Sequence, residues 1–110
     1  QTWDCPTNCL TGPKIVIGKW THVVGVGTSG AVTLYVDGVQ VGTKSVTNSP
    51  VVTDARIAAD SQSTPSNLYL GKIDEVRFSN VNRSTGWIAT EYNNQNSPRT
   101  FYMIGGPEKR

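Results

Sequence analysis

The stretch VTLYVDGVQV (residues 32–41) decides the fold class, because it carries the signature of a β-hairpin. Asp37 and Gly38 stand between two runs of strand-forming residues, and an Asp-Gly pair in that position favours a tight type I′ turn. A turn at this place fixes how the two strands align. It predicts three facing pairs: Val36 with Val39, Tyr35 with Gln40, and Leu34 with Val41.

Side-chain alternation divides this hairpin into an apolar face and a polar face. The apolar face collects Val32, Leu34, Val36, Val39 and Val41. Thr33, Tyr35 and Gln40 fall on the other face, as expected for an antiparallel sheet with one buried side. Tyr35 and Gln40 are therefore candidate ligand-binding residues, if their face is open to solvent. Another layer of structure covering Tyr35 is the alternative.

The segments around the hairpin also favour strands. Residues 15–18 and 20–27 are apolar, β-branched runs separated by a turn at Gly18 and Lys19. Further along, residues 54–60 favour a short strand and residues 68–79 a long one. The alternation in this long strand breaks its phase, which predicts a bulge or bend near residues 71–75.

One segment, residues 82–95, has helical character. Ser84 or Thr85 can cap its start. Ile88 and Tyr92 are one turn apart and predict the buried side, with Trp87 beside them. A last strand is expected over residues 97–105. The count of about seven strands and one short helix predicts an all-β protein, an antiparallel β-sandwich.

Composition excludes several classes of function. The chain has 110 residues, 36% of them hydrophobic, and a formal net charge of +2. Its basic residues are scattered and form no stripe, which argues against nucleic-acid binding. No apolar run is long enough to span a membrane. The expected organisation is an N-terminal segment (1–13), one sandwich domain (14–105) and a tail (106–110).

Cys5 and Cys9 are the two cysteines of the sequence. Two cysteines and one distant histidine do not make the usual zinc pattern. The preferred interpretation is a disulfide that closes a small loop around Pro6, which would place the protein in an oxidising compartment. Two unpaired thiols are the alternative.

Taken together and in order, three stretches resemble a known family. They are KWTHVVGVGTSGAVTLYVDGVQVG, then ARIAAD, then LYLGKIDEVRFSNVNRSTGWIATEYNNQNSP. The succession W-T-H-V, L-Y-V-D-G and G-x-I-D-E-V-R is similar to the C-terminal half of laminin-G-like, concanavalin-A-like lectin and glucanase domains. Such domains occur in large secreted or surface proteins of bacteria and archaea. The resemblance implies a jelly-roll sandwich.

The same resemblance implies that strands of the sandwich lie outside this sequence. Few residues precede Trp20, whereas domains of the family carry more strands before that segment. Half a sandwich would expose a large apolar face, which soluble proteins avoid. The missing strands are expected from another part of a larger protein or from another subunit. A smaller sandwich that closes with fewer strands is a third interpretation.

Asp74 and Glu75 are the most conspicuous acidic pair. Neighbouring residues of a strand point to opposite faces, so the two carboxylates would not converge on one bond, as glycoside hydrolysis requires. Their expected role is structural, with one acid bonded to backbone or to a nearby arginine. Hydrolases of the resembled class carry acids in a different, alternating pattern.

Calcium is the one cofactor that the resemblance implies, because laminin-G-like domains often hold it at a loop rim. Carboxylate oxygens suit calcium, so the candidate ligands are Asp54, Asp60, Asp37 and Asp74. Asp60 is the best placed, because it follows the expected strand and opens the polar loop. No compact calcium-binding motif is present. His22 is interpreted as a packed, structural histidine, because no nucleophile motif accompanies it. Trp20 and Trp87 are expected in the core, and Asp37 and Gly38 in the turn.

The sequence therefore predicts a secreted or surface-exposed module that is not an enzyme. It would bind carbohydrate or a protein partner as an adhesion unit. The first alternative is a structural subunit or accessory sandwich of a larger complex or filament. A part of a glycoside hydrolase, with acids supplied from elsewhere, is the least favoured interpretation.

Overall fold

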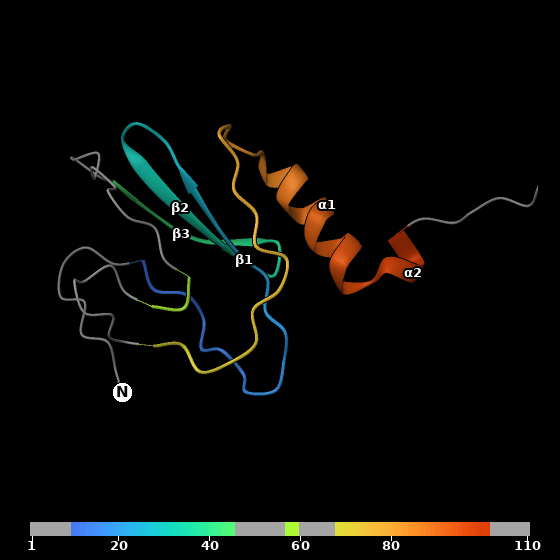
Figure 1. Cartoon of the computed structure of the whole chain (residues 1–110). Helices are drawn as coiled ribbons and strands as arrows, with labels where there is room; N and C mark the ends of the chain where they lie inside the picture. Colours follow the sequence, from blue (N-terminus) through green and yellow to red (C-terminus); the bar gives the residue numbers. More distant parts are fainter. Residues whose placement is uncertain (1–9, 46–56, 60–67, 102–110) are drawn as a thin grey trace, which may run out of the picture.

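The computed structural model describes residues 10–45, 57–59 and 68–101. Within these residues the fold is a three-stranded antiparallel sheet in the order β1-β2-β3, followed by two helices (Figure 1). The elements are β1 (Val23–Gly27), β2 (Ala31–Val36), β3 (Val39–Ser45), α1 (Thr85–Asn96) and α2 (Pro98–Phe101). None of the helices in these residues is long and apolar enough to cross a membrane.

The Asp-Gly hairpin is confirmed. Asp37 and Gly38 have φ angles of 49° and 77°, the left-handed pair that a type I′ turn requires. Val36 faces Val39 and Tyr35 faces Gln40, as predicted. The third predicted pair is wrong, because Gly42 rather than Val41 lies opposite Leu34. Val41 is the extra residue of a β-bulge, which the strand pattern does not reveal.

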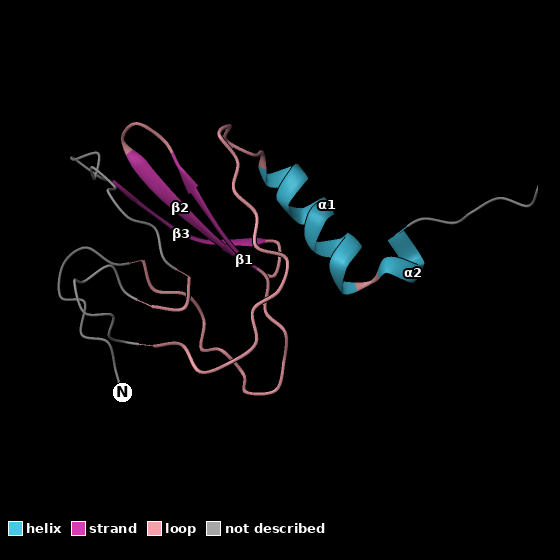
Figure 2. Ribbon diagram, in the orientation of Figure 1, coloured by secondary structure: helices cyan, strands magenta, loops and turns pink. Residues whose placement is uncertain are grey.

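Helix α1 covers one face of the sheet, here called the helix-covered face (Figure 2). Cross-strand pairing brings Val24 and Tyr35 together on this face. Ser84 caps the helix, since its hydroxyl oxygen accepts the backbone N–H of Trp87 at 3.2 Å. Ile88, on the side of α1 that faces the sheet, is completely buried. The predicted helix and its cap are thus confirmed, although α1 extends to Asn96.

The opposite face of the sheet, here called the outer face, has less cover. It carries Val23, Val32, Leu34 and Val36. Leu34 and Val36 lie close to Gly12, and the side chain of Leu10 approaches Gly42. The N-terminal segment thus lies against the middle of this face, while Val23 and Val32 stay exposed.

Three predicted strands are wrong. Residues 15–18 form no strand. The chain turns at residues 16–19 instead, where the Lys19 N–H donates to the Val16 carbonyl at 3.2 Å. Residues 68–79 run as irregular chain without a strand partner among the described residues. Residues 98–101 form the short helix α2 instead of a final strand. A β-branched or apolar run becomes a strand only when another strand pairs with it.

The core of the described part is very small. Tyr35, which is 6% exposed, and Ile88 are its only buried hydrophobic residues. Trp20 is 63% exposed and Trp87 is 40% exposed. The prediction that both tryptophans lie in the core is therefore wrong. Many other large apolar side chains are exposed, and the most exposed include Ile17, Leu70 and Phe78. The described residues thus form one three-stranded sheet with a helix on it, which is consistent with a fragment of a β-sandwich.

Several predictions lie outside the described residues. These are the Cys5–Cys9 disulfide, the metal ligands Asp54 and Asp60, and the tail at 106–110. Of the strand expected at 54–60, only residues 57–59 are described, and they form a bend. Ala58 accepts a backbone hydrogen bond from Tyr69 at 2.9 Å, which joins that bend to the start of the long irregular segment.

Candidate functional site

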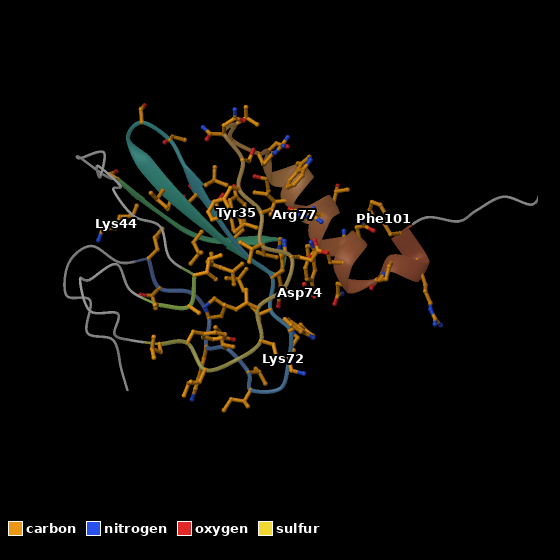
Figure 3. All side chains as sticks on the ribbon, viewed as in Figure 1. Tyr35, Lys44, Lys72, Asp74, Arg77 and Phe101 are labelled. Atoms are coloured by element: carbon orange, nitrogen blue, oxygen red, sulfur yellow. The ribbon has the colours of Figure 1, made fainter. Side chains whose placement is uncertain are left out.

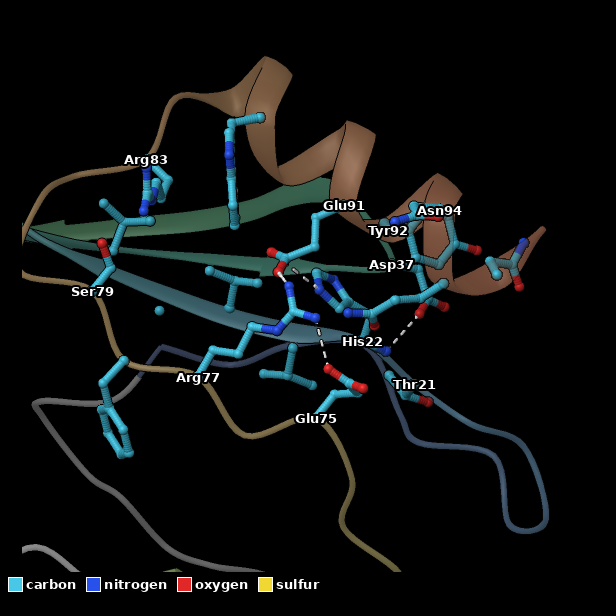
Figure 4. Close-up of a pocket in the computed structure, with 18 of the residues that line it drawn as sticks. Thr21, His22, Asp37, Glu75, Arg77, Ser79, Arg83, Glu91, Tyr92 and Asn94 are labelled. Carbon is cyan, nitrogen blue, oxygen red and sulfur yellow. Dashed lines mark hydrogen bonds and ion pairs between the residues drawn. The ribbon is translucent and has the colours of Figure 1, made fainter. Parts of the chain in front are cut away.

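An open groove lies between the edge strand β1, the irregular segment 74–83 and helix α1 (Figure 4). Its volume is about 1190 Å³. Every residue of β1 lines it, and both polar and aromatic side chains reach it from the other two walls. The groove thus brings together three parts of the chain that are distant in sequence.

Arg77 is the centre of an ionic cluster in this groove. Its Nη2 donates to Glu75 Oε2 at 2.7 Å, and its Nη1 donates to Glu91 Oε1 at 2.6 Å. The hydrogen bond that Arg77 donates to Glu75, with the negative charges of Glu75 and Glu91, raises the pKa of the Arg77 guanidinium above its usual value. Arg77 therefore stays charged and fastens the irregular segment to α1 (Figure 3).

His22 precedes β1, and its backbone N–H and carbonyl both bond to Asp37 of the hairpin turn. The His22 N–H donates to Asp37 Oδ1 at 3.0 Å, and the Asp37 N–H donates to the His22 carbonyl at 2.9 Å. Lys19 Nζ lies 3.6 Å from the other carboxylate oxygen of Asp37. Asp37 thus serves both as a turn residue and as an anchor for the start of β1.

The imidazole of His22 lies in the floor of the groove. Its Nε2 is 3.9 Å from Glu91 Oε2, and its ring centroid is 5.9 Å from that of Tyr92. Its Nδ1 is buried and has no hydrogen-bond partner among the described residues. The contacts with α1 are ring packing against Tyr92 and a close approach to Glu91, which agree with the expected structural histidine.

Asp74 and Glu75 are held by local contacts. Glu75 has a φ of 52°, and its N–H donates to Asp74 Oδ1 at 2.8 Å. Since this segment is not a strand, alternation does not determine where the two carboxylates point. Each is instead fixed by a separate bond, Asp74 to backbone and Glu75 to Arg77.

Tyr35 and Gln40, the sequence-predicted ligand residues, lie apart from the groove. The Tyr35 hydroxyl is 3.1 Å from Thr85 Oγ1, so the ring lies under the start of α1. The alternative in which another layer covers Tyr35 is the one that the structure adopts, with a helix as the layer. Gln40 is exposed, and its Nε2 donates to Thr43 Oγ1 at 3.2 Å.

The groove contains two residues that the sequence reasoning missed, Arg77 and Glu91. Glu91 lies three residues after Ile88 and one before Tyr92, so helical spacing alone could have placed it near the buried side. Pairing it with Arg77 required knowing how the segment folds back. Above them, the Arg83 guanidinium lies 4.7 Å from the centre of the Trp87 ring. Among the described residues, no group of three or more potential ligands could hold a metal ion.

Comparison with known proteins identifies the family. Residues 2–89 match the model of a laminin G family, described as the concanavalin A-like lectin/glucanases superfamily. The chain belongs to this family. The laminin-G-like resemblance seen in the sequence is therefore confirmed, and the sheet with its DG turn and following helix is the part of that fold described here.

One solved structure is similar to this laminin-G-like chain. It is an S-layer domain-containing protein (residues 221–444) from Clostridium thermocellum ATCC 27405, with 27% sequence identity and a TM-score of 0.62. The match covers 74% of this chain and 43% of that one, so this chain spans less than half of that structure. No curated protein matches the chain.

Proposed function

We propose that the chain is a non-catalytic, laminin-G-like module of a secreted or cell-surface protein. Membership of a family that includes lectins supports a binding role. The similar S-layer domain-containing protein supports a location at the cell surface. The module acts by binding carbohydrate or a protein partner, as an adhesion unit does.

The proposal that the chain is not an enzyme rests on the contacts that its acidic side chains make. All four acidic residues of the described part make structural contacts: Asp37, Asp74, Glu75 and Glu91. Glycoside hydrolysis needs two carboxylates that flank one bond and leave room for substrate. Here Glu75 and Glu91 instead both bond to one arginine, Arg77.

The groove is the proposed binding surface. Trp20 lines it with an exposed ring, and aromatic rings offer apolar faces on which sugars or apolar side chains pack. Asn82 and Asn94 add amide groups that donate and accept hydrogen bonds. A mixed aromatic and amide lining is suited to a neutral polar ligand.

Binding to a glycan array, followed by titration calorimetry of any hit, tests this proposal. Trp20→Ala is expected to weaken binding by about tenfold, because a stacked aromatic contributes about 1 kcal/mol or more. Tyr69→Ala removes an exposed aromatic outside the groove and is the control. Equal binding by both variants would exclude the groove as the binding surface.

A structural role in a larger assembly is the second candidate. The many exposed apolar side chains favour it, since they are the surface that further strands of a jelly roll would cover. Those strands would come from the rest of a longer protein or from another subunit. Absence of any glycan or protein ligand, together with stable association, would favour this role over binding.

A hydrolase fragment is tested separately. The chain is incubated with a panel of polysaccharides and the release of reducing ends is measured. We expect no release above background. Hydrolysis that is lost in Glu75→Gln would overturn the non-catalytic proposal.

A further inference from the structure

Arg83 differs from Arg77, the other arginine that lines the groove, because no described residue pairs with its charge. Glu75 and Glu91 bond to the two terminal nitrogens of Arg77. The guanidinium of Arg83 instead lies over the Trp87 ring, 4.7 Å from the ring centre, and bonds to no carboxylate in the described part of the chain. The groove therefore holds one cation whose charge is available to a ligand.

The contact with Trp87 orders the Arg83 side chain without using its hydrogen-bond donors. A guanidinium is attracted to the face of an aromatic ring, and its N–H groups remain able to donate. Both residues line the groove, and Arg83 is exposed to solvent there. A guanidinium can donate a pair of parallel hydrogen bonds to one carboxylate. Because Trp87 already restricts the side chain, Arg83 loses less freedom on binding than an unstacked arginine would.

The charges of the groove are distributed unevenly along it. Figure 4 shows Arg83 toward one end and Asp37 toward the other, with the Arg77 cluster between them. The lining residues Asn82 and Trp87, which stand beside Arg83, are uncharged. The lining as a whole contains four acidic residues and two arginines, so it is negative away from Arg83. A single carboxylate is thus favoured at Arg83, whereas a ligand with carboxylates along its whole length is repelled by the rest of the groove.

We propose that the groove recognises a neutral glycan that carries a single hexuronic acid, with the carboxylate of that sugar bound by Arg83. This inference rests on the proposed binding function and names the ligand class of the same groove. The exposed Trp20 ring and the amides of Asn82 and Asn94 match the neutral sugar rings, which present apolar faces and hydroxyl groups together. The acidic residues beyond Arg83 determine which way round the ligand lies.

Titration calorimetry with a matched pair of oligosaccharides tests the proposal. One is a neutral oligosaccharide that ends in glucuronic acid, and the other is the same compound after reduction of its carboxyl group to the alcohol. We expect the acidic form to bind about tenfold more tightly or better, because only it can accept charge-assisted hydrogen bonds from Arg83. This ratio of dissociation constants should shrink as the salt concentration rises, since Arg83 is exposed.

Substitutions of Arg83 show whether this residue is the source of the preference. Arg83→Gln should bring the ratio of the two dissociation constants close to one. Arg83→Lys keeps the charge but loses the planar fork, so it should leave an intermediate ratio. Arg99→Gln is the matched control, because it makes the same change at an exposed arginine outside the groove and should keep the full ratio. A general loss of structure would weaken both glycans alike, so the ratio reports on the carboxylate contact alone.

The possible failures of this inference and of the proposed function are distinguishable. Equal binding of the two oligosaccharides by the wild-type chain would overturn this inference and leave the binding proposal standing. A preference for the acidic form that Arg83→Gln retains would do the same. Binding of no glycan, here or on the array, would overturn carbohydrate recognition together with this inference. An acidic peptide that binds through Arg83 while no glycan binds would also overturn it, because the partner would then be a protein.

Discussion

Arg77 and Glu91 show how single residues hold the irregular segment in place. Glu91 is largely shielded, with 11% of its side chain exposed, whereas Glu75 is 55% exposed. Both carboxylates bond the same guanidinium. Exposed ion pairs contribute little to stability, while a hydrogen bond to a shielded charged group contributes more. The two acids should therefore differ in their effect on stability.

Glu91→Gln is expected to lower the free energy of unfolding by about 1 to 2 kcal/mol, because the hydrogen bond that joins Arg77 to α1 loses its charged acceptor. Glu75→Gln, the same substitution on the same arginine, should change it by less than about 1 kcal/mol. Urea unfolding of both variants measures the difference. Equal effects would mean that the cluster does not fasten the segment to α1.

Gly38 is the hairpin residue at which a substitution is expected to cost the most stability. Its φ of 77° is unfavourable for other residues, and a Cβ there would lie 3.0 Å from the Tyr92 ring. Gly38→Ala should therefore cost about 1 to 2 kcal/mol or more. Gly30→Ala, where a Cβ meets no atom within 4 Å, should stay within about 0.5 kcal/mol of wild type. A thermal or urea unfolding curve that ranks Gly30→Ala as the more damaging change would contradict this geometry.

Helix α1 is the element that covers the sheet, and two contacts determine its place. Ser84 begins it through a bond to the Trp87 N–H, and Ile88 packs its buried side. The first turn contains no acidic residue, so the Ser84 hydroxyl is the local stabilising feature at this end. The cap at Ser84 and the packing of Ile88 can be tested by separate substitutions.

Ser84→Ala should destabilise the protein by about 1 kcal/mol, because an N-terminal N–H of the helix loses its acceptor. Ser84→Asp keeps the acceptor and adds a favourable charge, so it should be as stable as wild type. Chemical denaturation of the pair provides the measurement. Destabilisation by Ser84→Asp would show that Ser84 does not stabilise the helix by accepting this hydrogen bond.

Ile88→Ala should cost about 2 to 5 kcal/mol, since it empties the centre of a small core. Ile17→Ala makes the same chemical change at a side chain that is 100% exposed. It should alter stability by no more than about 0.5 kcal/mol. Comparable losses in the two variants would mean that α1 is not anchored by Ile88.

Sequence reasoning succeeded where the signal was local. The DG turn, the register beside it and the Ser84 cap depend on a few neighbouring residues, and all three were predicted. It failed at residues 68–79, because strand formation needs a pairing partner that those residues do not find in the described part. The Arg77–Glu91 contact, fourteen positions apart, depends on chain folding and leaves little local trace.

At the scale of the whole molecule, the described residues form one sheet with a helix on one face and an incomplete cover on the other. Family membership and the exposed apolar side chains both accord with a fragment of a larger sandwich. The exposed apolar side chains are the surface that further strands of such a sandwich would cover.

Residue-resolved amide hydrogen exchange tests this account most directly. The amides of Val24 and Val26 bond to β2, so they should exchange slowly. The amides of Gly25 and Gly27 point away from β2 and have no backbone partner in the described part of the chain, so they should exchange faster. Rapid exchange of Val24 and Val26 would contradict the account.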